Sequence, residues 1–307
     1  FSLLKNGYTT AKIPKYLDKL EGRFITRYEK QSLSLGEFKK TGLLHLSKTN
    51  IKIQTKVKDF KSIKEVRIIP RNEYYCIEVV YEFKEVELKT EGVYSAIDLG
   101  LNNLATITFS DGSQPLIING KPLKSINQFY NKQKSIIQSE LEKINKKKKS
   151  KRLIRLTNKR NNKVNDYLHK SSFELVNQLV SRGVKCLVIG KNTNMKQDIN
   201  LGKVNNQNFT CLPIFKFANM IEYKCKKVGI KVIFQEESYT SKCSFLDLEE
   251  IKKQEIYLGK RIKRGLFVSS KGKVINADVN GSYNILRKAI PNVFVTEGIE
   301  VLAVKPL

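Results

Sequence analysis

Short runs of β-branched and aromatic residues dominate the first 90 positions of the chain. Four of these runs have the composition of β-strands, over residues 42–48, 51–57, 63–71 and 74–83. Arg71, Asn72 and Glu73 fit a hairpin turn between the last two runs. Residues 84–92 are polar, so we place a domain boundary there. Several short strands with turns predict a mostly β domain over residues 1–90, built as a small barrel or sandwich.

From residue 91 strands alternate with long amphipathic helices. Strand-like runs cover residues 93–98, 104–109, 115–119, 186–189 and 230–235. Apolar residues at steps of three and four predict two helices between 126 and 180, one beginning at Pro213 and one over 278–289. The order is β-β-β-α-β-α-β-α when the first two helices count as one hairpin. This order predicts an α/β domain of the ribonuclease-H-like type over residues 91–307. Its mixed five-stranded sheet would have the first strand at the centre and the fourth and fifth beside it.

Charge narrows the choice of partner. The 307 residues include 57 Lys and Arg but only 29 Asp and Glu, a formal net charge of +28. Because such a surplus repels itself, nucleic acid is the first partner to expect and an anionic membrane the second. We find no run of 18 apolar residues and no signal peptide, so a membrane partner is not expected. A hydrophobic content of 40% is enough for a folded core.

The cysteines and histidines are not spaced along the sequence as the ligands of a zinc site are. There are five cysteines, no C-x-x-C pair, and two histidines, His45 and His169. Structural zinc needs four clustered nitrogen or sulfur ligands, so we expect no zinc. An odd cysteine count also argues against disulfides. Any catalytic metal should therefore be held by oxygen ligands, which favours Mg²⁺ or Mn²⁺.

Acidic residues are scarce, and two of them stand at informative positions. Asp98 ends the first strand of the predicted sheet and Asp278 begins the last helix. The fourth strand ends in Gly190, with no acid, whereas the fifth is followed by Glu236 and Glu237. Neighbouring strands lie ~4.8 Å apart, so one of these two glutamates could reach across the small Gly190 toward Asp98. A turn-forming Asp98, an N-capping Asp278 and solvated glutamates around an inactive site are the alternatives.

Three segments resemble one protein family. They run from Ala96 to Thr106, from Glu237 to Cys243 and from Asn276 to Ile285. These segments look like the TnpB/OrfB proteins of insertion sequences, which are compact RNA-guided DNA endonucleases related to type V CRISPR effectors and Fanzor proteins. The resemblance implies an OB-like wedge domain followed by a RuvC-like nuclease domain. It further implies a magnesium- or manganese-dependent two-metal mechanism, a guide RNA from the protein's own locus, a DNA target, and a bacterial cytoplasmic location with nucleoid association on DNA.

On this resemblance Asp98, Glu237 and Asp278 are the catalytic and metal-binding residues. The family's glutamate normally follows the fourth strand, where Gly190 stands here. Glu237 matches a displaced position found in some branches of the family, and Glu236 is held in reserve.

The family's zinc ribbon is expected at about residues 240–275, in a degenerate form. Only Cys243 remains of its four cysteines. Residues 245–247 and 267–270 occupy the places of the two cysteine pairs, so we expect packing to hold this subdomain without zinc.

Family members usually carry a helical recognition domain inserted in the wedge. Little of such a domain is present before residue 40, and the chain begins with Phe1. We therefore expect the wedge domain to be incomplete at its N-terminus, by truncation or by native reduction.

Basic residues gather in two clusters, which we expect to contact nucleic-acid backbones. A charge run is usually only a solvated face, but the first cluster lies on the helical hairpin beside the acidic residues. The second lies in the insertion before Asp278 and could lead single-stranded DNA to the metals. The residues are Lys146, Lys147, Lys148, Lys149, Lys151, Arg152, Arg155, Lys159 and Arg160 in the first cluster, and Lys260, Arg261, Lys263 and Arg264 in the second.

The sequence thus favours a transposon-associated RNA-guided DNA endonuclease. Gly190 in place of the usual glutamate keeps a second hypothesis open, a nuclease-inactive RNA-guided DNA-binding regulator. A third is a basic RNA-binding protein that acts without a guide.

Overall fold

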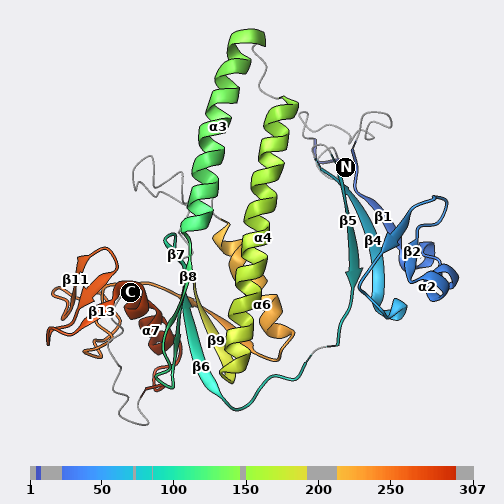
Figure 1. Cartoon of the computed structure of the whole chain (residues 1–307). Coiled ribbons are helices and arrows are strands. Elements are labelled where there is room, and N and C mark those ends of the chain that lie inside the picture. Colours follow the sequence, from blue (N-terminus) through green and yellow to red (C-terminus); the bar gives the residue numbers. More distant parts are fainter. Residues whose placement is uncertain are drawn as a thin grey trace. The chain divides into compact units, whose positions relative to one another are not determined.

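A computed structural model of the chain describes residues 5–7, 23–71, 74–84, 86–145, 150–191 and 213–294 (Figure 1). The chain divides into two compact units, Phe1–Lys84 and Glu85–Leu307. The boundary predicted from the sequence falls a few residues later, between positions 90 and 91.

The first unit contains two small antiparallel sheets. One has the strand order β1-β4-β5 and the other pairs β2 with β3. Its core is formed by Leu33, Phe38, Leu44, Ile63 and Val66, together with Leu46. The elements are β1 (Thr26–Glu29), η1 (Lys30–Ser32), α2 (Leu35–Thr41), β2 (Leu43–His45), β3 (Lys52–Gln54), η2 (Phe60–Ser62), β4 (Ile63–Pro70) and β5 (Tyr75–Tyr81). The four predicted strands correspond to β2 to β5, and the predicted hairpin turn lies mostly outside the described residues, which exclude 72 and 73.

The strand pattern missed the short helix α2, although its ends are marked in the sequence. Ser34 caps it, because its side chain accepts a hydrogen bond from the Glu37 amide at 3.3 Å. Gly42 ends it in the left-handed region at φ 72°, and its N–H donates to the carbonyl of Phe38 at 2.8 Å.

The second unit is built on a mixed five-stranded sheet with the order β10-β9-β6-β7-β8. β6, β9 and β10 are parallel, whereas β6, β7 and β8 form an antiparallel meander. The strands are β6 (Val93–Asp98), β7 (Asn103–Phe109), β8 (Leu116–Asn119), β9 (Val184–Lys191) and β10 (Lys231–Glu236). This confirms the predicted α/β fold, with the first strand central and the fourth and fifth on one side of it.

Helices cover both faces of this sheet because its central strands are apolar on both sides. Ile97 of β6 packs in the large core with side chains of α3, α4 and α6. Its neighbour Ala96 points the other way and packs against Ile285 and Leu286 of α7. The helices are α3 (Lys121–Asn145), α4 (Lys151–Ser181), α6 (Ile214–Lys226) and α7 (Ala277–Ala289).

The helices α3 and α4 run side by side as a long hairpin, and α6 lies along α4 (Figure 1). Despite their length, no helix within the described residues is apolar enough over its length to cross a lipid bilayer.

The insertion before α7 folds as a small antiparallel sheet, β11 (Lys260–Lys263), β12 (Leu266–Val268) and β13 (Val274–Asn276). We call residues 240–276 the ribbon. Phe245 stacks on Tyr283 of α7, with ring centroids 4.3 Å apart, and Phe267 and Ile275 complete the cluster. The ribbon is therefore anchored directly on α7, whose second residue is Asp278.

Candidate active site

Asp98 stands at the carboxyl end of the central strand, facing α7. Gly281 is what allows this close approach, because a Cβ at that position would lie 2.9 Å from the Asp98 Oδ2 atom. Gly281 and Asp278 are three residues apart and lie on the same face of α7. The close approach of Gly281 to Asp98 therefore also brings the Asp278 carboxylate to the end of β6.

Glu237 follows β10 directly, and its carboxylate occupies the space that a side chain on Gly190 would fill. In the parallel register Gly190 of β9 lies opposite Gln235 of β10. A Cβ on Gly190 would collide with the Glu237 carboxylate and would lie 2.7 Å from the Ile285 Cδ1 atom. The Glu237 carboxylate therefore occupies the space that is left free because residue 190 of β9 is a glycine.

Asp278 is the second residue of α7, and three neighbours fix it. Asn276 caps the helix by accepting from the Asp278 amide at 2.9 Å. The Asn103 side-chain amide donates to Asp278 Oδ2 at 2.7 Å, and Arg261 of β11 approaches Oδ1 at 3.3 Å. The Asp278 carboxylate is thus contacted by the side-chain amide of Asn103 in β7 and by the guanidinium of Arg261 in β11.

The electrostatics show that these carboxylates act on one another. Burial, and then repulsion from Glu237 and Asp278, raises the pKa of Asp98 to about 8. Burial raises the pKa of Glu237 to about 7, and the charge of Glu236 adds to the effect. A cation bound here would have to displace protons from these groups, because carboxylates bind a metal in their deprotonated form.

Glu236 lies outside this group. Its carboxylate accepts from the Lys288 ammonium at 2.7 Å and from the amide and hydroxyl of Ser238. The hydrogen bond from Lys288 is the main cause that lowers the pKa of Glu236. Of the two candidate glutamates, Glu237 is the one that repels Asp98.

The donor set fits a hard divalent cation, because it consists of three carboxylates beside two glycines that leave room for them. The side chains do not form a finished cage, since within the described ranges no group of three His, Cys, Asp or Glu is placed to hold a metal. Arg261 contacts one of the oxygens such a cage would use.

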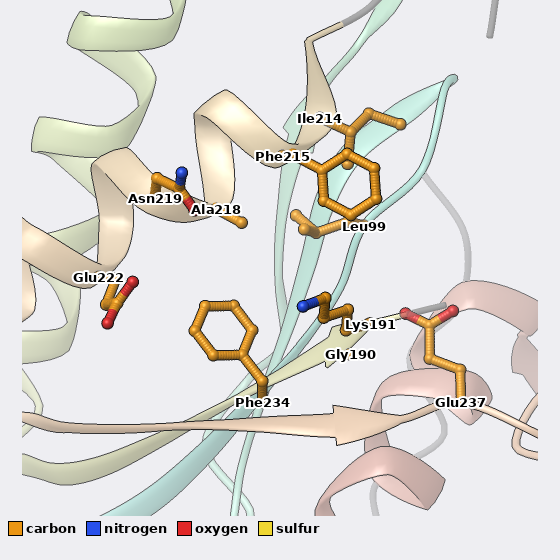
Figure 2. Close-up of a pocket in the computed structure, with 10 residues that line it drawn as sticks. All are labelled: Leu99, Gly190, Lys191, Ile214, Phe215, Ala218, Asn219, Glu222, Phe234 and Glu237. Carbon is orange, nitrogen blue, oxygen red and sulfur yellow. The ribbon is translucent and has the colours of Figure 1, made fainter. Parts of the chain in front are cut away.

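A pocket of about 270 Å³ lies beside Glu237, between α6 and the ends of β9 and β10 (Figure 2). The rings of Phe215 and Phe234 form much of its wall, and the Lys191 side chain extends into it. Glu237 lines this pocket together with polar side chains, among them Asn219 and Glu222.

The predicted basic residues have different surroundings. Lys151, Arg152 and Lys159 are exposed on α4, although Arg152 pairs with Glu140 at 3.1 Å. Arg160 is half-buried and bonds to Asn127 of α3 at 2.7 Å. Arg155, Lys260, Lys263 and Arg264 are exposed, whereas Lys146, Lys147, Lys148 and Lys149 lie outside the described residues.

Sequence reasoning did not foresee that Asn103 and Arg261 both contact Asp278. Asn103 lies in the same motif as Asp98, so an amide at the start of the returning strand was a usable signal. Arg261 was expected to contact nucleic acid, and no local pattern reveals a partner 17 residues away across a turn.

The strand order and the acidic edge place the second unit among the ribonuclease-H-like, or RuvC-like, α/β domains. The OrfB_IS605 model, described as a probable transposase, matches residues 75–196, and a Cas12f1-like TNB domain model matches residues 215–285. Over these two segments the chain is similar to transposase-related and Cas12f1-like proteins.

Two curated relatives are described as TnpB-like proteins. The chain is 28% identical over 204 residues to the TnpB-like protein ORF457 of Acidianus two-tailed virus, covering 64% of this chain and 42% of that protein. It is 30% identical over 175 residues to the TnpB-like protein MJ0751 of Methanocaldococcus jannaschii, covering 54% of this chain and 57% of that protein. The chain thus spans about half the length of these relatives.

Solved structures share the fold. One is a Cas12f1 chain in a complex with sgRNA and target DNA, with a TM-score of 0.54, 16% identity, and coverage of 75% of this chain and 46% of that one. Another is a chain of a CRISPR-Cas12f ternary complex, with a TM-score of 0.50, 15% identity, and coverage of 73% and 45%.

Proposed function

We propose that this chain is the nuclease part of an RNA-guided DNA endonuclease that is associated with a transposable element and acts in the bacterial cytoplasm. The observation that carries the proposal is the convergence of Asp98, Glu237 and Asp278 at one edge of the sheet. Similarity to transposase-related proteins and the RuvC-like fold support the same reaction class.

The three carboxylates would hold two Mg²⁺ or Mn²⁺ ions. Bound there, the ions would activate water for attack on a DNA phosphodiester and stabilise the leaving 3′ oxygen. Asp98 would be the central ligand of the three, because both Glu237 and Asp278 repel it. Asn103 orients Asp278 through its 2.7 Å hydrogen bond.

The basic surfaces would bind the polyanions. Exposed lysines on α4 suit the sugar-phosphate backbone of the guide RNA or its hybrid with DNA, because such contacts position without reading sequence. Base pairing to the guide, transcribed from the protein's own locus, would select the DNA target. Lys260, Lys263 and Arg264 of the ribbon would line the path of single-stranded DNA toward Asp278.

Cleavage by the complete protein with RNA from its own locus, target DNA and Mg²⁺ tests the proposal. We expect Asp98→Ala and Glu237→Gln each to bring strand cleavage down to background. Glu236→Gln is the matched control, and it should keep most of the activity because its carboxylate is engaged with Lys288 and Ser238. Cleavage that survives Asp98→Ala would overturn the assignment.

A second candidate is a nuclease-inactive RNA-guided DNA-binding regulator. It is favoured by the ion pair between Arg261 and Asp278, and by the lack of a finished metal cage in the described residues. It predicts tight guide-dependent DNA binding without cleavage at any Mg²⁺ or Mn²⁺ concentration. Binding with no preference for RNA from its own locus would instead indicate a guide-independent RNA-binding protein.

A further inference from the structure

A buried hydroxyl beside the acidic edge has no hydrogen-bond partner in the described part of the chain. Thr106, in the middle of β7, is fully buried, and its Oγ1 atom makes no hydrogen bond. Thr108, two residues along the same face, is also buried, but its hydroxyl lies 2.9 Å from that of Ser282. The difference is local, since the same residue type in the same strand is satisfied at one position and not at the other.

The strand register places Thr106 next to Asp98. The two residues are paired across β6 and β7, and Ala96 is paired with Thr108 in the same ladder. Paired residues of antiparallel strands point to the same face. Because Ala96 packs on α7 and Thr108 contacts Ser282 of α7, this face is the one that α7 covers. Thr106 therefore lies beside Asp98 in the layer between β7 and α7.

Threonine at position 106 is expected to lower the stability of the metal-free fold. Valine has the same shape as threonine and would fill the site without burying an unpaired polar atom. In the described residues the Asp98 carboxylate also accepts no hydrogen bond. Within this part of the chain Thr106 therefore has a hydroxyl donor without an acceptor, and the paired Asp98 carboxylate, a proposed metal ligand, is an acceptor without a donor.

We propose that Thr106 is a positioning residue whose hydroxyl donates a hydrogen bond to the Asp98 carboxylate in its ionised, metal-bound form. The proposal rests on the proposed function, because it assigns a supporting role to a neighbour of a proposed metal ligand. Hydrogen bonds of this kind orient a ligating carboxylate and stabilise its charge.

The test measures Mn²⁺ binding by electron paramagnetic resonance, together with the melting temperature of the metal-free full-length chain. We expect Thr106→Val to weaken Mn²⁺ binding by about tenfold or more and to raise the metal-free melting temperature by about 2–4 °C. Thr106→Ser keeps the hydroxyl and should restore most of the affinity.

Thr108→Val is the matched control. It removes a hydroxyl from the same face of the same strand, but one that is already bonded to Ser282. We expect it to lower the melting temperature and to leave the Mn²⁺ affinity unchanged. If Thr106 had a purely structural role, Thr106→Val would likewise leave the Mn²⁺ affinity unchanged.

The outcomes separate the two proposals. Equal Mn²⁺ affinity in the wild type and in Thr106→Val, with binding still lost in Asp98→Asn, would overturn the role of Thr106 and leave the metal site intact. Wild-type protein that binds no Mn²⁺ would overturn both.

Discussion

A carboxylate can reach the end of β6 from either of the two strands that run parallel to it on one side. Here β9 supplies Gly190 and β10 supplies Glu237, whose carboxylate occupies the volume that a Gly190 side chain would need. The two positions therefore compete for one space, and only one of them can carry the acid. This competition makes the position of the glutamate testable by exchange.

We expect Gly190→Glu alone and Glu237→Ala alone to be inactive, the first through steric conflict and the second through loss of a ligand. The double variant removes the conflict and returns a carboxylate to the same space, so it should recover Mn²⁺ binding and part of the cleavage. Metal binding by calorimetry and cleavage of target DNA measure the recovery. If the double variant bound Mn²⁺ and cleaved DNA no better than either single variant, the idea that the two carboxylates occupy the same space would be contradicted.

Gly190→Ala isolates the steric part of this argument. Its Cβ meets the Glu237 carboxylate and the Ile285 Cδ1 atom, so we expect a loss of about 1–3 kcal/mol of stability. Gly36→Ala in α2 is the control, because a Cβ there meets nothing within 4 Å and alanine favours a helix. Chemical denaturation of both variants measures the difference, and equal effects would show that the site is not crowded.

Asp98 also predicts how the metal-free protein responds to pH. Its pKa is raised in the folded state to about 8 but lies near 3.9 in an unfolded chain. Folding is therefore favoured by this group below about pH 4, and the contribution is lost as the pH rises toward 8. Asp98→Asn should be more stable than the wild type by roughly 2–4 kcal/mol near pH 8, with the difference shrinking toward pH 5.

Thermal unfolding across this pH range in the presence of a chelator measures the effect. Added Mn²⁺ should stabilise the wild type and close the gap, because a cation favours the ionised carboxylate. A difference between the two proteins that does not change with pH would contradict the raised pKa.

At the scale of elements, the ribbon is held together by hydrogen bonds to carboxylates at the places where the sequence resemblance led us to expect cysteines. Asp247 accepts from the amide of Ser270 at 2.9 Å and from its hydroxyl at 2.6 Å, which joins the two segments expected to carry the cysteine pairs. Glu249 is buried and accepts from the amides of Ser244 and Leu258. Carboxylate hydrogen bonds thus cross-link the loops on both sides of β11 and β12.

We expect Asp247→Ala to destabilise the ribbon by about 0.5–1.5 kcal/mol, because it removes the hydrogen bonds that join Asp247 to Ser270. Glu255→Ala is the control, since Glu255 is exposed on the same segment and no hydrogen bond is recorded for it. Hydrogen exchange of β12 and β13 amides measures local stability, and a zinc chelator should leave it unchanged. Loss of protection on chelation would show that a metal holds the ribbon after all.

The sequence pattern predicted the second unit better than the first, for a physical reason. The strands β6 and β9 are buried on both faces and the helices are long, so their hydrophobic periods are strong. β1 has four residues, three of them exposed, and exists because it pairs with β4, so its own sequence carries little signal.

The candidate site divides in the same way. Asp98 and Asp278 follow from where strands and helices end, which periodicity can locate, whereas the same reasoning left Glu236 and Glu237 both open and only the family resemblance favoured Glu237. Their neighbours Asn103, Arg261 and Thr106 depend on register and on a turn geometry that no local pattern encodes. Sequence therefore locates the carboxylates, but the groups that tune them require the fold.

At the scale of the whole molecule, a net charge of +28 cannot by itself distinguish a binding surface from a general attraction to polyanions. The helical hairpin offers a way to separate the two. Lys151 and Lys159 are exposed on α4, near its start, and no ion pair is recorded for either. Lys170 on α4 and Lys226 on α6 are each paired with an acid four residues earlier, Asp166 and Glu222.

The double variants Lys151→Gln/Lys159→Gln and Lys170→Gln/Lys226→Gln remove the same charge from the same unit. If the start of α4 contacts phosphates, the first variant should reduce the slope of log affinity against log salt by roughly 1.4–1.8, because each lost contact removes about 0.7–0.9. The second should leave the slope nearly unchanged. Filter binding of the guide RNA at several salt concentrations measures both, and equal losses of slope would mean that only total charge matters and that the hairpin is no defined interface.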